Sequence, residues 1–253
     1  MALSNQTRNR SFRGGGAMYL RDKSDAASGF FQVGNADSLA FAIAEEKQSQ
    51  RNYTLKGGGN IASDSVIGEV TASINVLSIN PRIAAVALRA LVTTIASTTI
   101  SAEPHTVYLD MFVPFNFLPD FDETLTVTND GATITYVEGT DFSIKNNGIF
   151  IKSDSTMTNA LAILLTYTSK DEYSIDTITK PSAEYEMFFD GFNEADGGKS
   201  VAIKCHKISF SPTQALSLIT EDFAALPLDF EVLADSDKNG TTESQYFVVQ
   251  MEQ

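Results

Sequence analysis

Apolar and polar residues alternate along much of this chain, and the alternation predicts β-strands. In residues 68–79 (GEVTASINVLSI), Val70, Ala72 and Ile74 occupy one parity and polar residues the other. A half-buried strand requires this period of two, because successive side chains point to opposite faces. Further strands are predicted within 29–46, across 106–168, and in four segments after 183. The sequence therefore predicts an all-β fold.

Turn residues divide these strands into hairpins. Residues 29–46 predict a hairpin that turns near Gly34. Asn129-Asp130-Gly131 and Asn146-Asn147-Gly148 predict two consecutive hairpins, since these residue types tolerate the positive φ of tight turns. The polar segment 47–65, with glycines at 57–59, predicts a long mobile loop.

One helix is predicted after Asn80. Asparagine caps the first amides of a helix, and Pro81 suits its first position, where the N–H has no helical partner. The following RIAAVALRALVTTI has apolar residues at helical spacing, and these form a stripe that we expect to pack on the sheet. The members of the stripe are Ile83, Val86, Ala87, Ala90 and Leu91.

The single cysteine precedes one of the two histidines in KSVAIKCHKISFSP (199–212). Val201, Ile203 and Cys205 share one parity, whereas Ile208 and Phe210 share the other. Such a slip predicts a β-bulge near His206 and Lys207. Neighbouring strand residues point apart, so we expect a packed, inert thiol with the imidazole on the opposite face.

Composition fits a globular protein. The chain has 253 residues, 43% hydrophobic and 20% charged, which is enough for one large β domain or two small ones. The longest apolar run, 83–95, contains Arg89 and falls short of the roughly 20 residues that span a bilayer. No apolar segment follows the N-terminal arginines, so a secretory signal is not predicted. A lone cysteine excludes an internal disulfide and fits synthesis in a reducing compartment.

Charge is divided unevenly. The net charge is −14, yet residues 1–23 carry five basic side chains against Asp22 alone. An acidic body argues against gripping nucleic acid through phosphate neutralisation, which needs clustered lysine and arginine. The basic segment reads either as a nucleic-acid contact or as an arm that orders on an acidic neighbour.

No pattern predicts a metal or catalytic centre. DSDKNGTTESQY (235–246) resembles a calcium loop, but Tyr246 stands where such a loop needs a bidentate glutamate. His105 has no spaced partner and is predicted to be a solvated loop residue. Two histidines and one cysteine are too few for the usual zinc sites. No cofactor is predicted; paired acids of a glycoside hydrolase remain a third reading, because carboxylates are abundant.

Three segments resemble the tail tube proteins of long-tailed bacteriophages. They are FFQVGNADSLAFAI, GEVTASINVLSINPRIAAVALRAL and KSVAIKCHKISFSPTQALSLITEDFAALPLDFEVLAD, and the block TVTNDGATITYVEGTDFSI…GIFI is also similar to one found in several such proteins. The resemblance implies a β-sandwich or barrel with one flanking helix, in hexameric rings stacked into a tube. It implies a flexible basic arm at 1–23, a tube fold in 24–105 and 183–253, and an inserted hairpin block at 106–182.

The resemblance also implies surfaces. Strands 37–46 and 66–79 would present a small or polar parity to the lumen: Ser38, Ala40, Ala42, Ala44, Glu69, Thr71, Ser73 and Asn75. The arm and loop 47–60 would reach neighbouring rings through Arg8, Arg10, Arg13, Lys47, Arg51, Tyr53 and Lys56. An acidic lumen repels DNA phosphates during passage.

The implied role is that of a non-enzymatic virion protein, assembled in the bacterial cytoplasm and located in the tail. Its implied partners are copies of itself and the tail tip or baseplate, tape-measure and terminator proteins, with DNA passing unbound and no membrane contact. Contractile and non-contractile tails share this tube fold, so both remain open. The alternative is another tail-associated or secretion-system module without enzymatic activity.

Overall fold

The computed structural model describes residues 11–25, 27–238 and 241–252. The chain forms two compact units: unit 1 comprises the residues up to Leu91 and from Ile175 onward, and unit 2 spans Val92–Ser174. Both consist mainly of antiparallel strands, and the described residues contain a single α-helix, so the all-β prediction is confirmed. Unit 2 begins before the predicted block 106–182, because strand β6 (Thr99–Val107) pairs with a strand of that unit. It also ends earlier than predicted, at Ser174.

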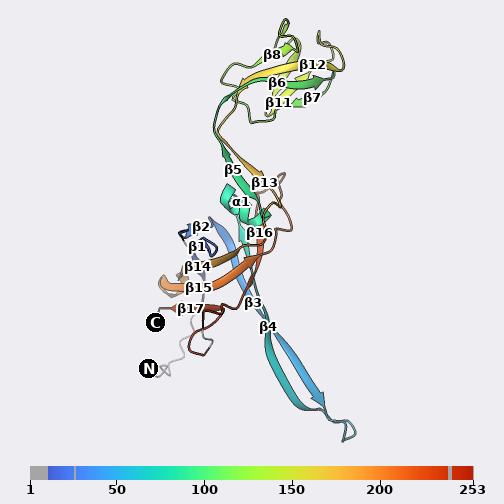
Figure 1. Cartoon of the computed structure of the whole chain (residues 1–253). Helices are drawn as coiled ribbons and strands as arrows, with labels where there is room; N and C mark the ends of the chain where they lie inside the picture. The colour runs from blue at the N-terminus through green and yellow to red at the C-terminus, as the bar shows by residue number, and fades with distance from the viewer. Residues whose placement is uncertain (1–10, 26, 239–240, 253) are drawn as a thin grey trace. The chain divides into compact units, whose positions relative to one another are not determined.

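Unit 1 is built on one large sheet whose strands follow the order β2-β1-β14-β15-β16-β4-β3, with β17 also paired to β15 (Figure 1). All of these neighbours are antiparallel. The strands are β1 (Gly14–Asp22), β2 (Phe31–Gln32), β3 (Ala36–Arg51), β4 (Asn60–Val76), β14 (Glu184–Asn193), β15 (Lys199–Phe210), β16 (Leu226–Val232) and β17 (Phe247–Met251).

The core of unit 1 lies on one side of this sheet, here called the inward face. The parity predicted from 68–79 is confirmed, since Val70, Ala72 and Ile74 of β4 are buried. Phe41 of β3 stacks on Phe247 of β17 with ring centroids 5.2 Å apart. Two strands that are not neighbours in the sheet therefore contact each other through the core. The opposite side of the sheet is called the outward face.

Helix α1 (Pro81–Leu88) covers part of the core. Asn80 caps it as predicted, its Oδ1 accepting from the Ile83 N–H at 2.9 Å. The helix ends at Leu88 because Arg89 adopts the left-handed conformation, with φ 48°. The predicted stripe therefore extends too far: Leu91 is exposed and begins strand β5 (Leu91–Ile95).

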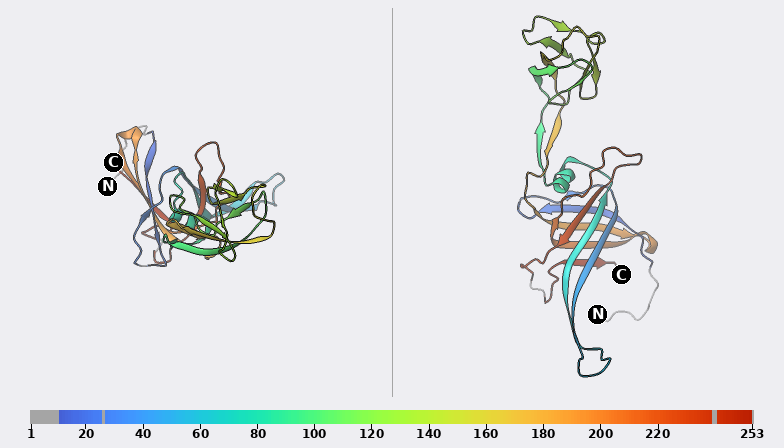
Figure 2. Two further views of the ribbon diagram at one scale, coloured as in Figure 1. Left: turned by 90° about the horizontal axis from the view of Figure 1, so that it is seen from above. Right: turned by 90° about the vertical axis from the view of Figure 1, so that its right-hand side faces the viewer.

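Two predicted mobile segments are wrong in part. Residues 14–22 of the expected arm form β1, which pairs with β14 over nine consecutive positions and buries Met18 and Leu20. The expected loop 47–65 is mostly strand: β3 and β4 form one long hairpin closed by residues 52–59, which projects as a ribbon (Figure 2). Its outer half is exposed on both faces, so the sequence there carries no alternation.

Unit 2 packs a four-stranded sheet, β6-β12-β8-β9, and a three-stranded sheet, β10-β11-β7, around its own core. Both predicted hairpins are confirmed as β8–β9 and β10–β11. The strands are β6 (Thr99–Val107), β7 (Phe112–Pro114), β8 (Thr126–Asn129), β9 (Thr135–Tyr136), β10 (Phe142–Lys145), β11 (Gly148–Ile151) and β12 (Leu161–Thr168). The chain enters along β5 and returns along its partner β13 (Glu172–Asp176).

Candidate functional site

The outward faces of β3, β4 and β16 join into one surface of small and acidic residues, here called the acidic face. Register places Ala42 beside Thr71 and Thr71 beside Glu231, and likewise Ala40, Ser73 and Asp229 in the next row. The face comprises Ser38, Ala40, Ala42 and Ala44 of β3, Glu69, Thr71, Ser73 and Asn75 of β4, and Asp229 and Glu231 of β16.

The carboxylates of the acidic face have no cationic partner. Glu69, Asp229 and Glu231 form no ion pair with any residue that the structure describes, and none of the ten positions is basic. A shallow hollow of about 410 Å³ lies on this face between Ala42, Ser73 and Asp229. Like charges left unpaired on a surface create a negative potential that repels polyanions.

All eight predicted lumen residues lie together on this face. Ser38, Ala40 and Ala42 alternate along β3 ahead of the bulge between Ile43 and Glu45, and Ala44 lies within that bulge. Whether the face lines a lumen stays a prediction. Sequence reasoning missed Asp229 and Glu231; the alternation of LPLDFEV gives their parity, but only the pairing of β16 with β4 places them here.

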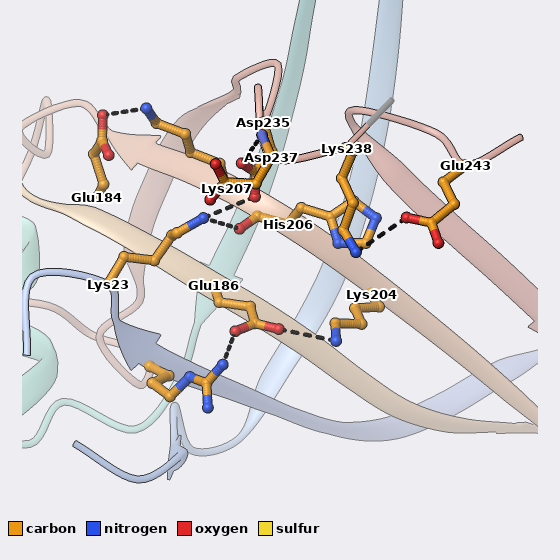
Figure 3. Close-up of polar contacts among 11 residues, drawn as sticks. Lys23, Glu184, Glu186, Lys204, His206, Lys207, Asp235, Asp237, Lys238 and Glu243 are labelled. Carbon is orange, nitrogen blue, oxygen red and sulfur yellow. Dashed lines mark hydrogen bonds and ion pairs between the residues drawn. The ribbon is translucent and has the colours of Figure 1, made fainter. Parts of the chain in front are cut away.

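The outward faces of β1, β14 and β15 form a contrasting paired-charge cluster (Figure 3). At the centre of this cluster is the buried Glu186, whose carboxylate contacts the Arg21 guanidinium and lies 3.1 Å from Lys204 Nζ. Burial disfavours ionisation of Glu186, but the hydrogen bonds from Arg21 and Lys204 prevail and lower its pKa. Lys207 pairs with Glu184 at 2.7 Å. Charges here are neutralised locally.

His206 and Lys207 occupy the predicted bulge, and Cys205 directly precedes it. Two residues of β15, His206 and Lys207, face the single residue Glu186 of β14. Cys205 packs fully in the inward core, and burial raises the pKa of its thiol to about 12, so the thiolate nucleophile is scarcely populated at neutral pH. The prediction of a packed thiol is confirmed.

His206 lies in the paired-charge cluster. It is 8% exposed, and its Nε2 is buried without a hydrogen-bond partner among the described residues. Burial first, then the nearby charges of Lys238 and Lys204, lower the pKa of His206. The imidazole is therefore held neutral near pH 7.

Asp235, the first position of the calcium-like loop, is committed to another contact. It accepts from Lys23 Nζ at 2.8 Å, and this hydrogen bond lowers the pKa of Asp235. Asn239 and Gly240 of that motif lie outside the described residues. Across the described ranges, no three His, Cys, Asp or Glu side chains are placed to hold a metal ion.

The predicted contact residues lie at two places. Arg8 and Arg10 are outside the described residues, and Arg13 pairs with Glu194 at 3.0 Å in an exposed contact. The remaining four lie on the outer hairpin: Lys47 and Arg51 on β3, Tyr53 and Lys56 in its closing turn. All four are exposed, and Tyr53 has 86% of its surface open to solvent.

Unit 2 holds a buried cluster that the sequence did not suggest. Glu103 accepts from Tyr167 Oη at 2.8 Å and the Asn116 N–H at 3.2 Å, and its Oε1 lies 2.5 Å from His105 Nε2. Burial and the bond to Glu103 raise the pKa of Tyr167. The prediction of a solvated loop residue at His105 is wrong, because Pro104 sits within strand β6 and leaves Glu103 and His105 on the same side.

Sequence similarity indicates a protein family. A family model described as protein of unknown function UCP028589 matches residues 11–250, which is most of the chain. No curated protein matches the sequence. Among the described residues, no helix has the length and apolar character needed to cross a bilayer.

Proposed function

The chain belongs to the UCP028589 family, and from its surfaces we propose that it is a structural, non-enzymatic subunit that assembles into stacked hexameric rings. The rings form a tube of the kind found in long-tailed phages, through which DNA is ejected. The observation that carries the proposal is the acidic face, whose carboxylates form no ion pair with a described residue while its other residues are small or uncharged. A wall for DNA passage needs these properties, because unpaired carboxylates repel phosphate and small side chains leave room.

The free edge of β3 supports self-assembly. β3 is the terminal strand of the sheet order and carries 16 residues, paired on one side to β4 alone. A long unpaired edge templates pairing with another chain unless it is protected. In the proposed ring, β3 joins the sheet of the next subunit, and the acidic faces become one continuous lining.

The outer hairpin supports stacking. A two-stranded ribbon without a packed face is marginally stable alone, yet Tyr53, Leu55 and Ile61 are all more than half exposed at its end. We assign this hairpin, with Lys47, Arg51, Tyr53 and Lys56, to contacts with a neighbouring ring. The arm that includes Arg8, Arg10 and Arg13 is assigned the same role, since its charge complements an acidic neighbour.

The setting follows from the proposed tube. Its partners are further copies, the tail tip or baseplate, and the tape-measure and terminator proteins, within a virion tail assembled in the bacterial cytoplasm. DNA passes without specific binding.

Electron microscopy of the purified protein across a concentration series tests the proposal. We expect six-fold rings and hollow tubes. Monomers at every concentration would contradict self-assembly, and rings of another symmetry would contradict the hexamer.

A second arm of the experiment tests the lining. Tubes formed by Asp229→Lys with Glu231→Lys should retain DNA in a salt-dependent manner, whereas wild-type tubes should not. Asp154→Lys, an exposed acidic position of unit 2, is the matched control and should leave DNA retention unchanged.

A further inference from the structure

The inward face of unit 1 is not fully covered by the residues that the structure describes. An open apolar groove of about 550 Å³ lies between the start of β3 and the strands β1, β14, β15 and β17. Its lining includes Met18, Phe41, Phe189, Ile203, Val249 and Met251. Val249 is 43% exposed and Met251 64% exposed, so apolar side chains on the core side of the sheet face solvent.

Glycine at position 16, on the lining of this groove, allows β1 to lie close against β14. At Gly16 a Cβ would lie 2.4 Å from the carbonyl oxygen of Asp190 and 2.9 Å from the Phe189 ring. Any larger residue would push β14 and the Phe189 side chain away from their present positions.

A second apolar feature of unit 1 is the loop 211–225 between β15 and β16, here called the apolar loop. Leu218, Ile219 and Phe223 are 82%, 99% and 99% exposed. The base of the loop is fixed, since the Thr213 N–H donates to the Ala87 carbonyl at 2.8 Å and Thr213 Oγ1 donates to that of Pro227 at 2.9 Å. None of its residues lines the groove of the same chain.

The area of the apolar loop is in the range that a stable contact needs. From their sizes, the side chains of Leu218, Ile219 and Phe223 together offer about 400 Å². A specific interface buries roughly 800 Å² on each partner, and the remaining exposed residues of the loop can supply the other half. Clustered exposure of this kind marks an interaction site.

We infer that the apolar loop of one copy of this chain occupies the apolar groove of the next copy. The occupant is a second copy because every chain carries both an apolar groove that its described residues leave open and an apolar loop of suitable area. The two surfaces differ, so the contact is heterologous, and its repetition closes into a ring or continues as a filament. The inference rests on the proposed assembly and names one contact within it.

Cross-linking between differently sized copies tests the contact. Ile219→Cys chains carrying an affinity tag are mixed with untagged Val249→Cys chains and oxidised with glutathione disulfide. Cys205 is buried and does not compete. We expect a mixed disulfide between the two chains, and none above background when Ile61→Cys, a more exposed hairpin position, replaces Val249→Cys.

Two outcomes of this experiment would overturn the inference. One is equal cross-linking to Val249→Cys and Ile61→Cys. The other is an intrachain disulfide in a diluted chain carrying both Ile219→Cys and Val249→Cys, which would show that the loop fills its own groove.

Charge substitution separates this inference from the proposed function. Phe223→Asp should weaken self-association at least tenfold in sedimentation experiments, whereas Ser217→Asp, an exposed polar position of the same loop, should change it less than twofold. Circular dichroism checks that both variants fold. If wild-type and Phe223→Asp protein assemble equally, the loop contact is wrong and the tube proposal stands. If wild-type protein does not associate, both are wrong.

Discussion

The outward face of the large sheet carries two regions that use charge in opposite ways. On β1, β14 and β15, Glu186, Arg21 and Lys204 are paired and partly buried. On β3, β4 and β16, Glu69, Asp229 and Glu231 are exposed and unpaired with described residues. A buried charged side chain destabilises the folded state unless it is paired, whereas an exposed charge needs no partner. We therefore attribute the charges of the first region to the stability of the fold, and those of the second region to the proposed repulsion of DNA.

The largest expected effect is in the paired-charge cluster. Glu186→Ala removes a hydrogen-bonded carboxylate and should lower the free energy of unfolding by about 2 kcal/mol, a value reduced because Arg21 and Lys204 are each partly exposed. Asp229→Ala should change it by less than about 0.5 kcal/mol. Urea unfolding measures both. Equal losses would remove the distinction between the two regions.

The next prediction concerns Cys205, which is buried on the inward face of the same sheet. Cys205→Ser places a hydroxyl in an apolar core and should cost roughly 1 kcal/mol, in line with core substitutions generally. Assembly should persist in electron micrographs. A folded variant that formed no tubes would show that the thiol has a role beyond packing.

His206 gives the paired-charge cluster a dependence on pH. Because the pKa of His206 is lowered in the folded protein, its contribution to stability is complete above the ordinary value near 6.5 and is lost as pH falls toward the folded pKa. Glu186 and Asp235, whose pKa values are also lowered, keep their contributions to stability over this range and lose them only at more acidic pH. We expect wild-type protein to lose stability between pH 7 and pH 5 through His206.

The control for this dependence is His206→Phe, which keeps a ring of similar shape without a titrating nitrogen. Its unfolding free energy should vary less over the same pH range. It should also match wild type at pH 7, because Nε2 has no described partner to lose. An identical pH dependence in both proteins would assign the effect to other groups.

The smallest effect on stability is expected at the acidic face. Asp229→Lys with Glu231→Lys should leave urea unfolding nearly unchanged, within about 0.5 kcal/mol, because neither carboxylate forms an ion pair with a described residue. A loss above about 2 kcal/mol would mean that this face, too, stabilises the fold.

The local sequence pattern predicted the features that depend on neighbouring residues, namely the bulge in β15 and the start of α1. The parity slip between Cys205 and Ile208 located the bulge, because each side chain records which face it occupies. Asn80 and Pro81 predicted the helix start, because capping is local. The helix end was missed, since the apolar run continues from Leu88 into β5 and residue type alone does not set the φ of Arg89.

Features that depend on distant pairing could not be predicted. Gly14 to Gly16 read as a flexible arm, although β14, which joins the sheet from the far end of the sequence, fixes them in β1. The outer hairpin has no alternation because neither of its faces is buried, and its strands are held by backbone pairing. Asp229 and Glu231 entered the acidic face only through the register of β16 with β4.

Cys205, the one cysteine of the sequence, is unreactive toward thiol reagents in the folded state. With its thiol fully buried and its pKa raised to about 12, Cys205 reacts only when the sheet opens around it. The rate at which a thiol reagent modifies the unaltered protein therefore reports how often β14, β15 and β17 separate. The native sequence thus contains its own probe of opening kinetics at the centre of unit 1.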